Sequence, residues 1–219
     1  GGASLVLNKH SIIAPSFTAV LEWGDTSKPY RYLPTFAPGT TVVKGETIDS
    51  VNRKRLPARI SDQVPVKRQR YALAGLYARR FTKVTLRITE RLYFDSWGVK
   101  STTTDFLLPW DIHRHVRVWP HLRLYAQTGA SFWKRAYFVE ATPEGLNLPL
   151  LRTGDRELGP MVAGTAGAAA RFEFGTSTTG RSFGLTIKAD AVYARFLNHL
   201  YTRGRFGVFG GATGEVVFR

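Results

Sequence analysis

The feature of this sequence that most constrains its fold is an alternation of apolar and polar residues with a period of two. In residues 116–131, Val118, Leu122 and Leu124 alternate with charged neighbours such as Arg117 and Arg123. A β-strand places such alternating residues on opposite faces, whereas a helix would scatter both sets around its axis. The pattern recurs in residues 16–23, 84–97, 183–196 and 205–219, and less regularly in 70–79 and 159–174.

Several of these segments exceed the 5–6 residues of an ordinary globular strand and reach the 9–11 residues, roughly, that a membrane-spanning strand needs. The connections between them alternate in length. Short ones are expected near residues 79–83, 111–115 and 175–181, and long ones at 24–69 and 132–158. Tight turns on one side and long loops on the other are typical of outer-membrane barrels. We therefore predict an all-β, antiparallel, up-and-down transmembrane β-barrel.

The strand count bears on whether the barrel is complete. Eight strands are expected from residue 16 onward, and residues 4–10 resemble a ninth that ends at a turn near 11–15. Eight strands would close a small barrel alone. Nine would imply further strands before residue 1, because single-chain bacterial barrels normally have an even number. We expect one domain over residues 1–219, with 24–69 and 132–158 as long extracellular loops, and the strand count leaves open whether this domain is a whole barrel or part of a larger one.

Composition excludes some chemistry and suggests partners. The chain has no cysteine, which excludes disulfides, thiolate zinc sites and cysteine nucleophiles. Its formal net charge is +15. Such a balance favours a polyanionic partner, either nucleic acid or an anionic membrane surface.

One charged set falls on the polar face of the predicted strands. Charge on a lipid-exposed face costs about 2–4 kcal/mol at the bilayer midplane, so we expect this set to face an enclosed lumen. Two interpretations remain open: an anion-favouring lumen, or a salt-bridged interior that simply fills the barrel. The number of fitting pairs favours the second. The predicted lumen-facing residues are Arg87, Arg91, Asp95, Arg117, His121, Arg123, Lys188, Asp190, Arg205 and Glu215.

Glu90 departs from this pattern. By strict alternation it faces lipid between Ile88 and Leu92. A local β-bulge would turn it inward. A soluble protein would also explain it, so Glu90 counts against the membrane interpretation.

A second charged set lies in residues 51–70, where Asp62 is the only acid. Clustered cations bind phosphate strongly, so we expect this loop to contact lipopolysaccharide. A solvated loop is the plainer alternative. Nucleic acid is disfavoured, because no recognition helix, zinc finger or stacking platform accompanies the charge. The predicted contact residues are Arg53, Lys54, Arg55, Arg59, Lys67 and Arg68.

The sequence offers weak signals for catalysis. His113 and His115 are two residues apart in a predicted turn, but no third ligand accompanies them by spacing. No serine occupies a recognisable nucleophile elbow. We expect no catalytic, cofactor-binding or metal-binding residues, no cofactor and no enzyme activity. The five tryptophans lie near predicted strand ends, which favours interfacial aromatic girdles over core packing; they are Trp23, Trp97, Trp110, Trp119 and Trp133.

Five segments carry a family resemblance. They are residues 24–34 (GDTSKPYRYLP), 55–59 (RLPAR), 91–105 (RLYFDSWGVKSTTTD), 118–123 (VWPHLR) and 152–160 (RTGDRELGP). In these segments the chain resembles an uncharacterised domain-of-unknown-function family, of 3570 type, of proteobacterial and myxobacterial outer-membrane β-barrel proteins. The resemblance implies a barrel of which this chain is the C-terminal part. It implies no functional residue, since none is established for that family.

The sequence thus predicts an integral outer-membrane protein of structural or channel type. Its expected partners are outer-membrane lipids, lipopolysaccharide and other envelope proteins. Two alternatives stay open: a soluble basic β-protein that binds nucleic acid, and a membrane-embedded hydrolase or lipid-modifying enzyme. The substrate, pore size and oligomeric state do not follow from the sequence.

Overall fold

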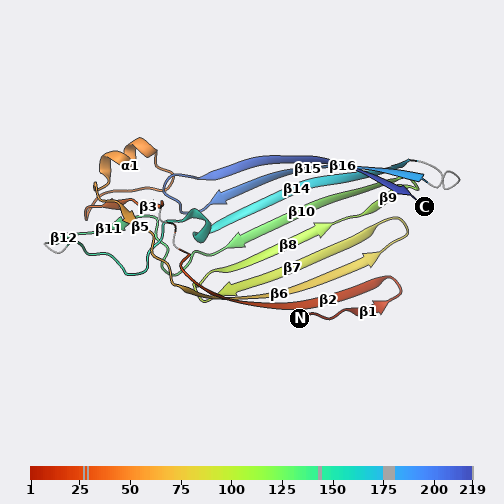
Figure 1. Ribbon diagram of the computed structural model, residues 1–219, viewed down its shortest axis with the longest axis horizontal. Coiled ribbons are helices and arrows are strands. Elements are labelled where there is room, and N and C mark those ends of the chain that lie inside the picture. Colours follow the sequence, from red (N-terminus) through yellow and green to blue (C-terminus); the bar gives the residue numbers. More distant parts are fainter. Residues whose placement is uncertain (27, 29, 143–144, 175–180, 219) are drawn as a thin grey trace.

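The long strands form one antiparallel sheet in which each pairs with the next long strand along the chain (Figure 1). The structure is a computed structural model that describes residues 1–26, 28, 30–142, 145–174 and 181–218. The all-β, antiparallel prediction is confirmed. In sheet order the strands are β1 (Leu5–Asn8), β2 (Ser11–Trp23), β6 (Lys67–Arg80), β7 (Thr85–Asp95), β8 (Lys100–Leu107), β10 (Val116–Gln127), β14 (Met161–Phe174), β15 (Arg181–Phe196) and β16 (Gly204–Phe218), and β9 (Trp110–His113) pairs with β10.

The sheet does not close into a barrel. Its edges are β1 and β16, and among the described residues β16 pairs with β15 alone. Two predicted boundaries are wrong. The turn expected at 11–15 lies at 9–10, because β2 begins at Ser11, and the strand expected over 116–131 ends at Gln127. The turn expected at 175–181 falls mostly on 175–180, outside the described residues.

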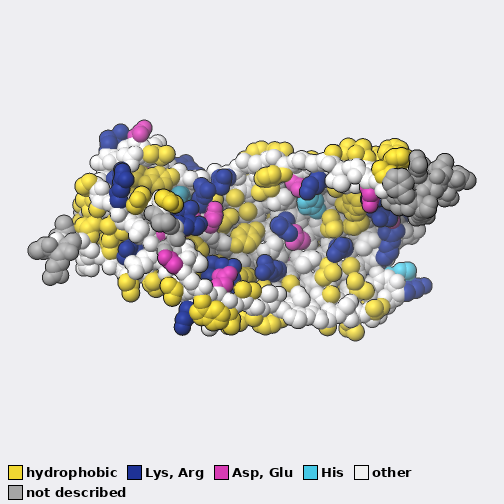
Figure 2. All heavy atoms as spheres, viewed as in Figure 1, with side chains coloured by type: hydrophobic (Ala, Val, Ile, Leu, Met, Phe, Trp, Pro, Cys, Tyr) yellow, Lys and Arg dark blue, Asp and Glu magenta, His cyan; other side chains and the backbone are white. Residues whose placement is uncertain are grey.

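Register is continuous from β2 to β16, so each long strand keeps the same two faces. Leu92 lies opposite Leu73 and Thr102, and its neighbour Arg91 lies opposite Ala74 and Thr103. A slip of one residue in any strand would exchange the faces. The charged side chains share one face with the lining of a hollow, which Figure 2 views directly. We call this the concave face and its opposite the convex face.

The convex face is mostly apolar, and no second layer of the described residues covers it. Leu92, Phe206 and Val208 are 51%, 71% and 67% exposed. Phe17, Tyr71 and Phe94 stack across three strands on this face, with ring centroids 6.4 and 5.3 Å apart. A compact chain of this length would expose about 10,000 Å², whereas this chain exposes 14,190 Å². An open sheet with an exposed apolar face agrees with this excess.

The long connections fold together at one end of the sheet (Figure 1). We call residues 24–66, 128–160 and 197–203 the cap. Tyr137 and Phe138 pair in parallel with Thr35 and Phe36, which joins the two long loops. Its elements are β3 (Tyr32–Leu33), β4 (Thr35–Phe36), α1 (Ile48–Lys54), β5 (Ile60–Ser61), β11 (Tyr137–Phe138), β12 (Ala141–Thr142), β13 (Gly145–Leu146) and the 3₁₀ turn η1 (Arg156–Leu158).

The cap holds most of the buried apolar side chains. Phe36, Val42, Val51 and Leu200 form one cluster, and Leu33 anchors a second around Tyr137 and Val139. Thr47 caps α1 by accepting a hydrogen bond from the backbone N–H of Ser50 at 3.3 Å. The two long loops are therefore a packed unit with its own core.

No helix in the described ranges is both long enough and apolar enough to cross a bilayer.

The cap core generates a stability prediction. Phe36 is 0% exposed, whereas its ring neighbour Phe138 is 50% exposed. Phe36→Ala should destabilise the cap by about 3–5 kcal/mol, because it leaves a cavity in a packed cluster. Phe138→Ala is the matched control and should cost about 1 kcal/mol or less. Denaturant unfolding followed by tryptophan fluorescence measures both, and equal losses would contradict this packing.

Candidate functional site

The ten residues predicted to face a lumen all lie on the concave face. On β7 and β10 these residues are the odd-numbered ones. The strand pairings from β10 through β14 to β16 show that the same face is formed by even-numbered residues of β15 and by odd-numbered residues of β16. Figure 2 shows their charged side chains gathered over the middle of the sheet. The polar face is thus a single charged surface contributed by strands far apart in sequence.

Most carboxylates of the concave face bind an arginine. Arg123 Nε lies 2.6 Å from Asp105 Oδ1, directly across the β8–β10 ladder. Asp111 binds both Arg80, at 2.6 Å, and Arg117. The remaining pairs are Arg70 with Glu22 at 2.8 Å, and Arg171 with Glu173 at 3.0 Å and with Glu215 at 2.7 Å.

Four cations of this face have no such partner. Among the described residues, no carboxylate lies within ion-pair distance of Arg87, Arg91, Lys188 or Arg205. The concave face therefore combines features of both predicted interpretations: an extensive set of salt bridges and a surplus of positive charge.

His121 and Asp190 meet above a glycine. His121 Nε2 lies 3.3 Å from Asp190 Oδ1, without hydrogen-bond geometry. A Cβ built on Gly167 would lie 2.1 Å from Asp190 Oδ1 and 2.9 Å from His121 Cε1. Only glycine at this position leaves room for both side chains.

Glu90 stays on the convex face, so the predicted bulge is wrong. The β6–β7 and β7–β8 ladders run through it without a shift. Its carboxylate accepts hydrogen bonds from the hydroxyls of Thr102 and of Thr104, the latter at 2.6 Å. Cross-strand threonines satisfy the acid in place.

Asp95 organises the end of the sheet nearest the cap. Its Oδ1 accepts hydrogen bonds from the backbone N–H groups of Trp97 and Val99 at 3.0 and 2.9 Å. Its Oδ2 accepts from Arg68 Nη2 at 2.5 Å and from the Tyr93 hydroxyl at 2.8 Å. Arg68 also stacks on the Trp97 ring at 4.2 Å and is only 15% exposed. Its predicted place in a lipopolysaccharide-contacting loop is wrong, because β6 already begins at Lys67.

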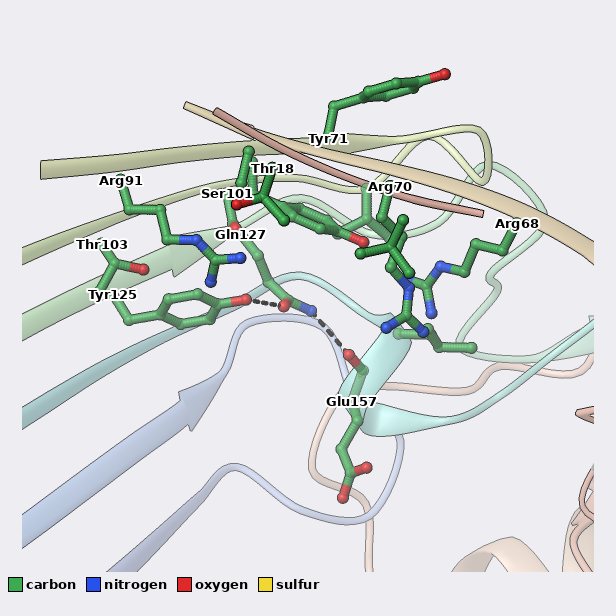
Figure 3. A pocket seen from close by; sticks show the side chains of 15 residues that line it. Thr18, Arg68, Arg70, Tyr71, Arg91, Ser101, Thr103, Tyr125, Gln127 and Glu157 are labelled. Atoms are coloured by element: carbon green, nitrogen blue, oxygen red, sulfur yellow. Dashed lines mark hydrogen bonds between the residues drawn. The ribbon is translucent and has the colours of Figure 1, made fainter. Parts of the chain in front are cut away.

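A pocket of about 360 Å³ lies between the sheet and the cap (Figure 3). We call it the junction pocket. Strands β2, β6, β7, β8 and β10 supply its wall, and Glu157 and Leu158 of η1 cover it. Figure 3 shows Arg70 and Arg91 on the pocket side of the sheet and Tyr71 pointing away from it, as the alternation requires.

The other predicted basic residues lie at or beside the cap. Arg53, Lys54, Arg55, Arg59 and Lys67 are exposed. Lys54 pairs with Glu46, and the guanidinium of Arg59 lies 5.7 Å from the Tyr32 ring centre. Part of this charge is therefore already engaged within the cap.

The tryptophans do not form the predicted girdles. Trp97 is 5% exposed, and the Trp133 indole packs in the same cluster and donates to the Asp155 carbonyl at 2.8 Å. Trp119 lies on the concave face. Trp23 and Trp110 are the two on the convex face. The indole N–H groups of Trp97 and Trp133 bond to backbone carbonyls, which draws these side chains inward.

The histidine pair His113 and His115 has no third metal ligand among the described residues. The His113 and His115 rings lie 5.6 Å apart beside the β9–β10 turn. Within the described ranges, no group of three or more His, Asp or Glu side chains is placed to hold a metal ion.

A network that sequence reasoning missed joins the two long loops of the cap. Asp155 is 4% exposed and binds Arg31 and Lys28, the latter at 2.7 Å. Burial raises the pKa of Asp155, but hydrogen bonds from Arg31 and Lys28 outweigh it and hold the pKa below its ordinary value. Burial raises the pKa of nearby Asp62 with weaker compensation. The available signal was the resemblance itself, since residues 24–34 and 152–160 supply both sides of this network.

The pKa values of Asp155 and Asp62 shift in opposite directions, so replacing these two acids should have opposite effects on stability. A lowered folded-state pKa means that Asp155 stabilises the cap above its unfolded value of about 3.9, and that this is lost as pH falls through the folded pKa. Asp155→Asn should therefore cost about 1–3 kcal/mol at pH 7 and reduce the loss of stability on acidification. Asp62→Asn should be neutral or stabilising at pH 7, since its ionised form is disfavoured. Unfolding at pH 7 and pH 4 measures both, and a larger loss for Asp62→Asn would contradict the network.

Comparison with known proteins identifies a family and little else. No curated protein and no solved structure matches this chain. The family model described as "Protein of unknown function (DUF3570)" matches residues 2–195, which include every strand from β1 to β14 and nearly all of β15. The chain therefore belongs to this family of unknown function.

Proposed function

We propose that the chain forms part of the wall of an outer-membrane β-barrel with a lumen that favours anions. The observation that carries the proposal is the uncovered apolar convex face. In the described strands, Glu90 is the only Asp, Glu, Lys, Arg or His in the middle of that face, and two threonines bind it. Hydrocarbon is a suitable solvent for such a surface, and water is not.

Basic residues bound this apolar band. Lys67, Lys100 and Arg195 lie at the cap ends of their strands on the convex face, and Arg79 lies near the opposite end of β6. Residues 68–78 separate the two charges of β6. This spacing agrees with the roughly 9–11 residues of a spanning strand. Lysine and arginine at such positions can reach lipid phosphates while their stems stay in the apolar layer.

Barrel closure requires a strand partner for each edge of this sheet. The free edges of β1 and β16 present unpaired backbone groups, and open edges are not tolerated in hydrocarbon. In the proposal, strands N-terminal to this sheet pair with both edges and enclose the concave face.

The cap then lies on the outer side of the membrane. Its exposed cations Arg53, Arg55 and Arg59 are suited to the phosphates of lipopolysaccharide. This places the long loops outside and the short turns inside, which is the usual arrangement for outer-membrane barrels.

A pair of adjacent substitutions tests the membrane assignment. Ile187 is 47% exposed on the convex face near the middle of β15, and Thr186 precedes it on the concave face. Ile187→Arg should cost about 2–4 kcal/mol in folding into lipid vesicles, and Thr186→Arg should cost less than about 1 kcal/mol. Equal costs would contradict the assignment, as would extraction of the wild-type protein from cell envelopes without detergent.

Conductance tests the lumen. At low salt, where screening is weak, Arg87→Gln with Lys188→Gln should move the reversal potential of the full-length protein toward cation preference, because both cations lack a carboxylate partner. The matched control is Arg123→Gln with Asp105→Asn, which removes one salt bridge without changing net charge and should leave selectivity almost unchanged. Planar-bilayer recordings measure the reversal potential of each variant. Equal shifts of the reversal potential for both double variants would contradict the assignment of Arg87 and Lys188 to the lumen.

A further inference from the structure

The junction pocket has an apolar side. Val20, Ala72, Val99 and Leu158 line it together with the ring of Tyr93. Leu158 comes from η1, which the Gln127 side chain ties to β10 by donating to the carbonyls of Glu157 and Gly159 at 2.9 and 2.7 Å. This wall is therefore held in place before any ligand arrives.

Positive charge lies among these apolar residues, since Arg70 is the cross-strand neighbour of Val20 and the Arg91 guanidinium lies 6.0 Å from the Tyr93 ring centre. Arg91 has no carboxylate partner among the described residues, and in Figure 3 its guanidinium points toward Tyr125 and Gln127 across the cavity. Arg70 binds Glu22 through Nη2, but its buried Nε has no hydrogen-bond partner. Two guanidinium groups thus keep donors available at one site.

Glu22 neutralises Arg70 in part, but among the described residues no carboxylate pairs with Arg91. Asp95 is occupied by Arg68. Glu157 contributes its backbone carbonyl to the Gln127 hydrogen bond, and its carboxylate points away from Arg91 (Figure 3). Ser101 and Thr103 add small polar side chains to the lining. The pocket therefore combines positive charge at Arg91 with apolar side chains elsewhere in its lining.

We propose that the junction pocket binds a small organic anion. Its carboxylate or phosphate head would accept hydrogen bonds from Arg91, with the free Arg70 Nε nearby, and its apolar body would pack on Val20, Val99 and Leu158. A volume of about 360 Å³ lies within the range of small-molecule sites. This inference deepens the proposed function by giving the lumen a selective site beneath the cap, but the binding it predicts needs no conductance.

Three probes test the ligand class on the full-length protein folded in detergent micelles, by isothermal titration calorimetry. Benzoate has both a head and a ring, acetate has only the head, and benzylammonium has a ring with the wrong charge. Benzoate should bind most tightly, acetate much more weakly, and benzylammonium not at all. Equal affinity for acetate and benzoate, binding of benzylammonium, or no benzoate binding would each overturn the proposal.

Variants locate the site. Arg91→Gln should weaken benzoate binding about tenfold or more, the loss expected for a charge-assisted hydrogen bond. Arg87→Gln is the matched control, because Arg87 lies on the same strand and face, also lacks a carboxylate partner, and does not line the pocket. Glu22→Gln should tighten binding severalfold by freeing Arg70. Equal affinities for the Arg91 and Arg87 variants would overturn the assignment.

The two proposals fail separately. A conducting protein that ignores benzoate would overturn the junction pocket alone. A protein that is soluble without detergent and binds benzoate through Arg91 would overturn the membrane wall alone. Circular dichroism of Arg91→Gln and Arg91→Lys checks that the sheet is intact, and the lysine variant should retain part of the affinity because it keeps the charge.

Discussion

The absence of a second layer against the long sheet is the constraint on which the rest of this structure depends. Apolar side chains gain roughly 25 cal/mol for each Å² removed from water. The convex face obtains only part of that from its own chain, since Leu92, Phe206 and Val208 stay 51%, 71% and 67% exposed. The rest of this free-energy gain must come from whatever surrounds the convex face. The sharp difference between the two faces also penalises any slip in register, which agrees with the unbroken ladders from β2 to β16.

The cap follows the opposite principle. It excludes water with its own side chains, around Phe36 and Leu33. The strands contribute little to these clusters, so sheet and cap are stabilised in different ways. They meet at Gln127 of β10, which donates to the carbonyls of Glu157 and Gly159, and in the cluster that packs Trp97 and Val99 against Ala130 and Leu158. These contacts fix the position of η1 over the concave face.

The sequence predicted what is local and failed where the outcome depends on distant partners. Alternation is a property of each strand, so it identified the strands and the face of residues such as Arg117 and Lys188. The cap was predicted only as loops, because its short strands owe their form to partners a hundred residues away, as in the pairing of β4 with β11. Glu90 was misread for the same reason, since the threonines that satisfy it lie on the next strand.

Cross-strand register accounts for several of the pairs on the concave face, and it bears on where the pocket forms. Arg123 and Arg117 each lie directly opposite an aspartate. Arg91 lies between Ala74 and Thr103, and Lys188 lies between Ala169 and Gly211. Small neutral neighbours leave a cation both without a partner and with open space around it. At Arg91 this open space borders the cap. The small neighbours Ala74 and Thr103 therefore leave Arg91 without a partner and also leave room for the pocket.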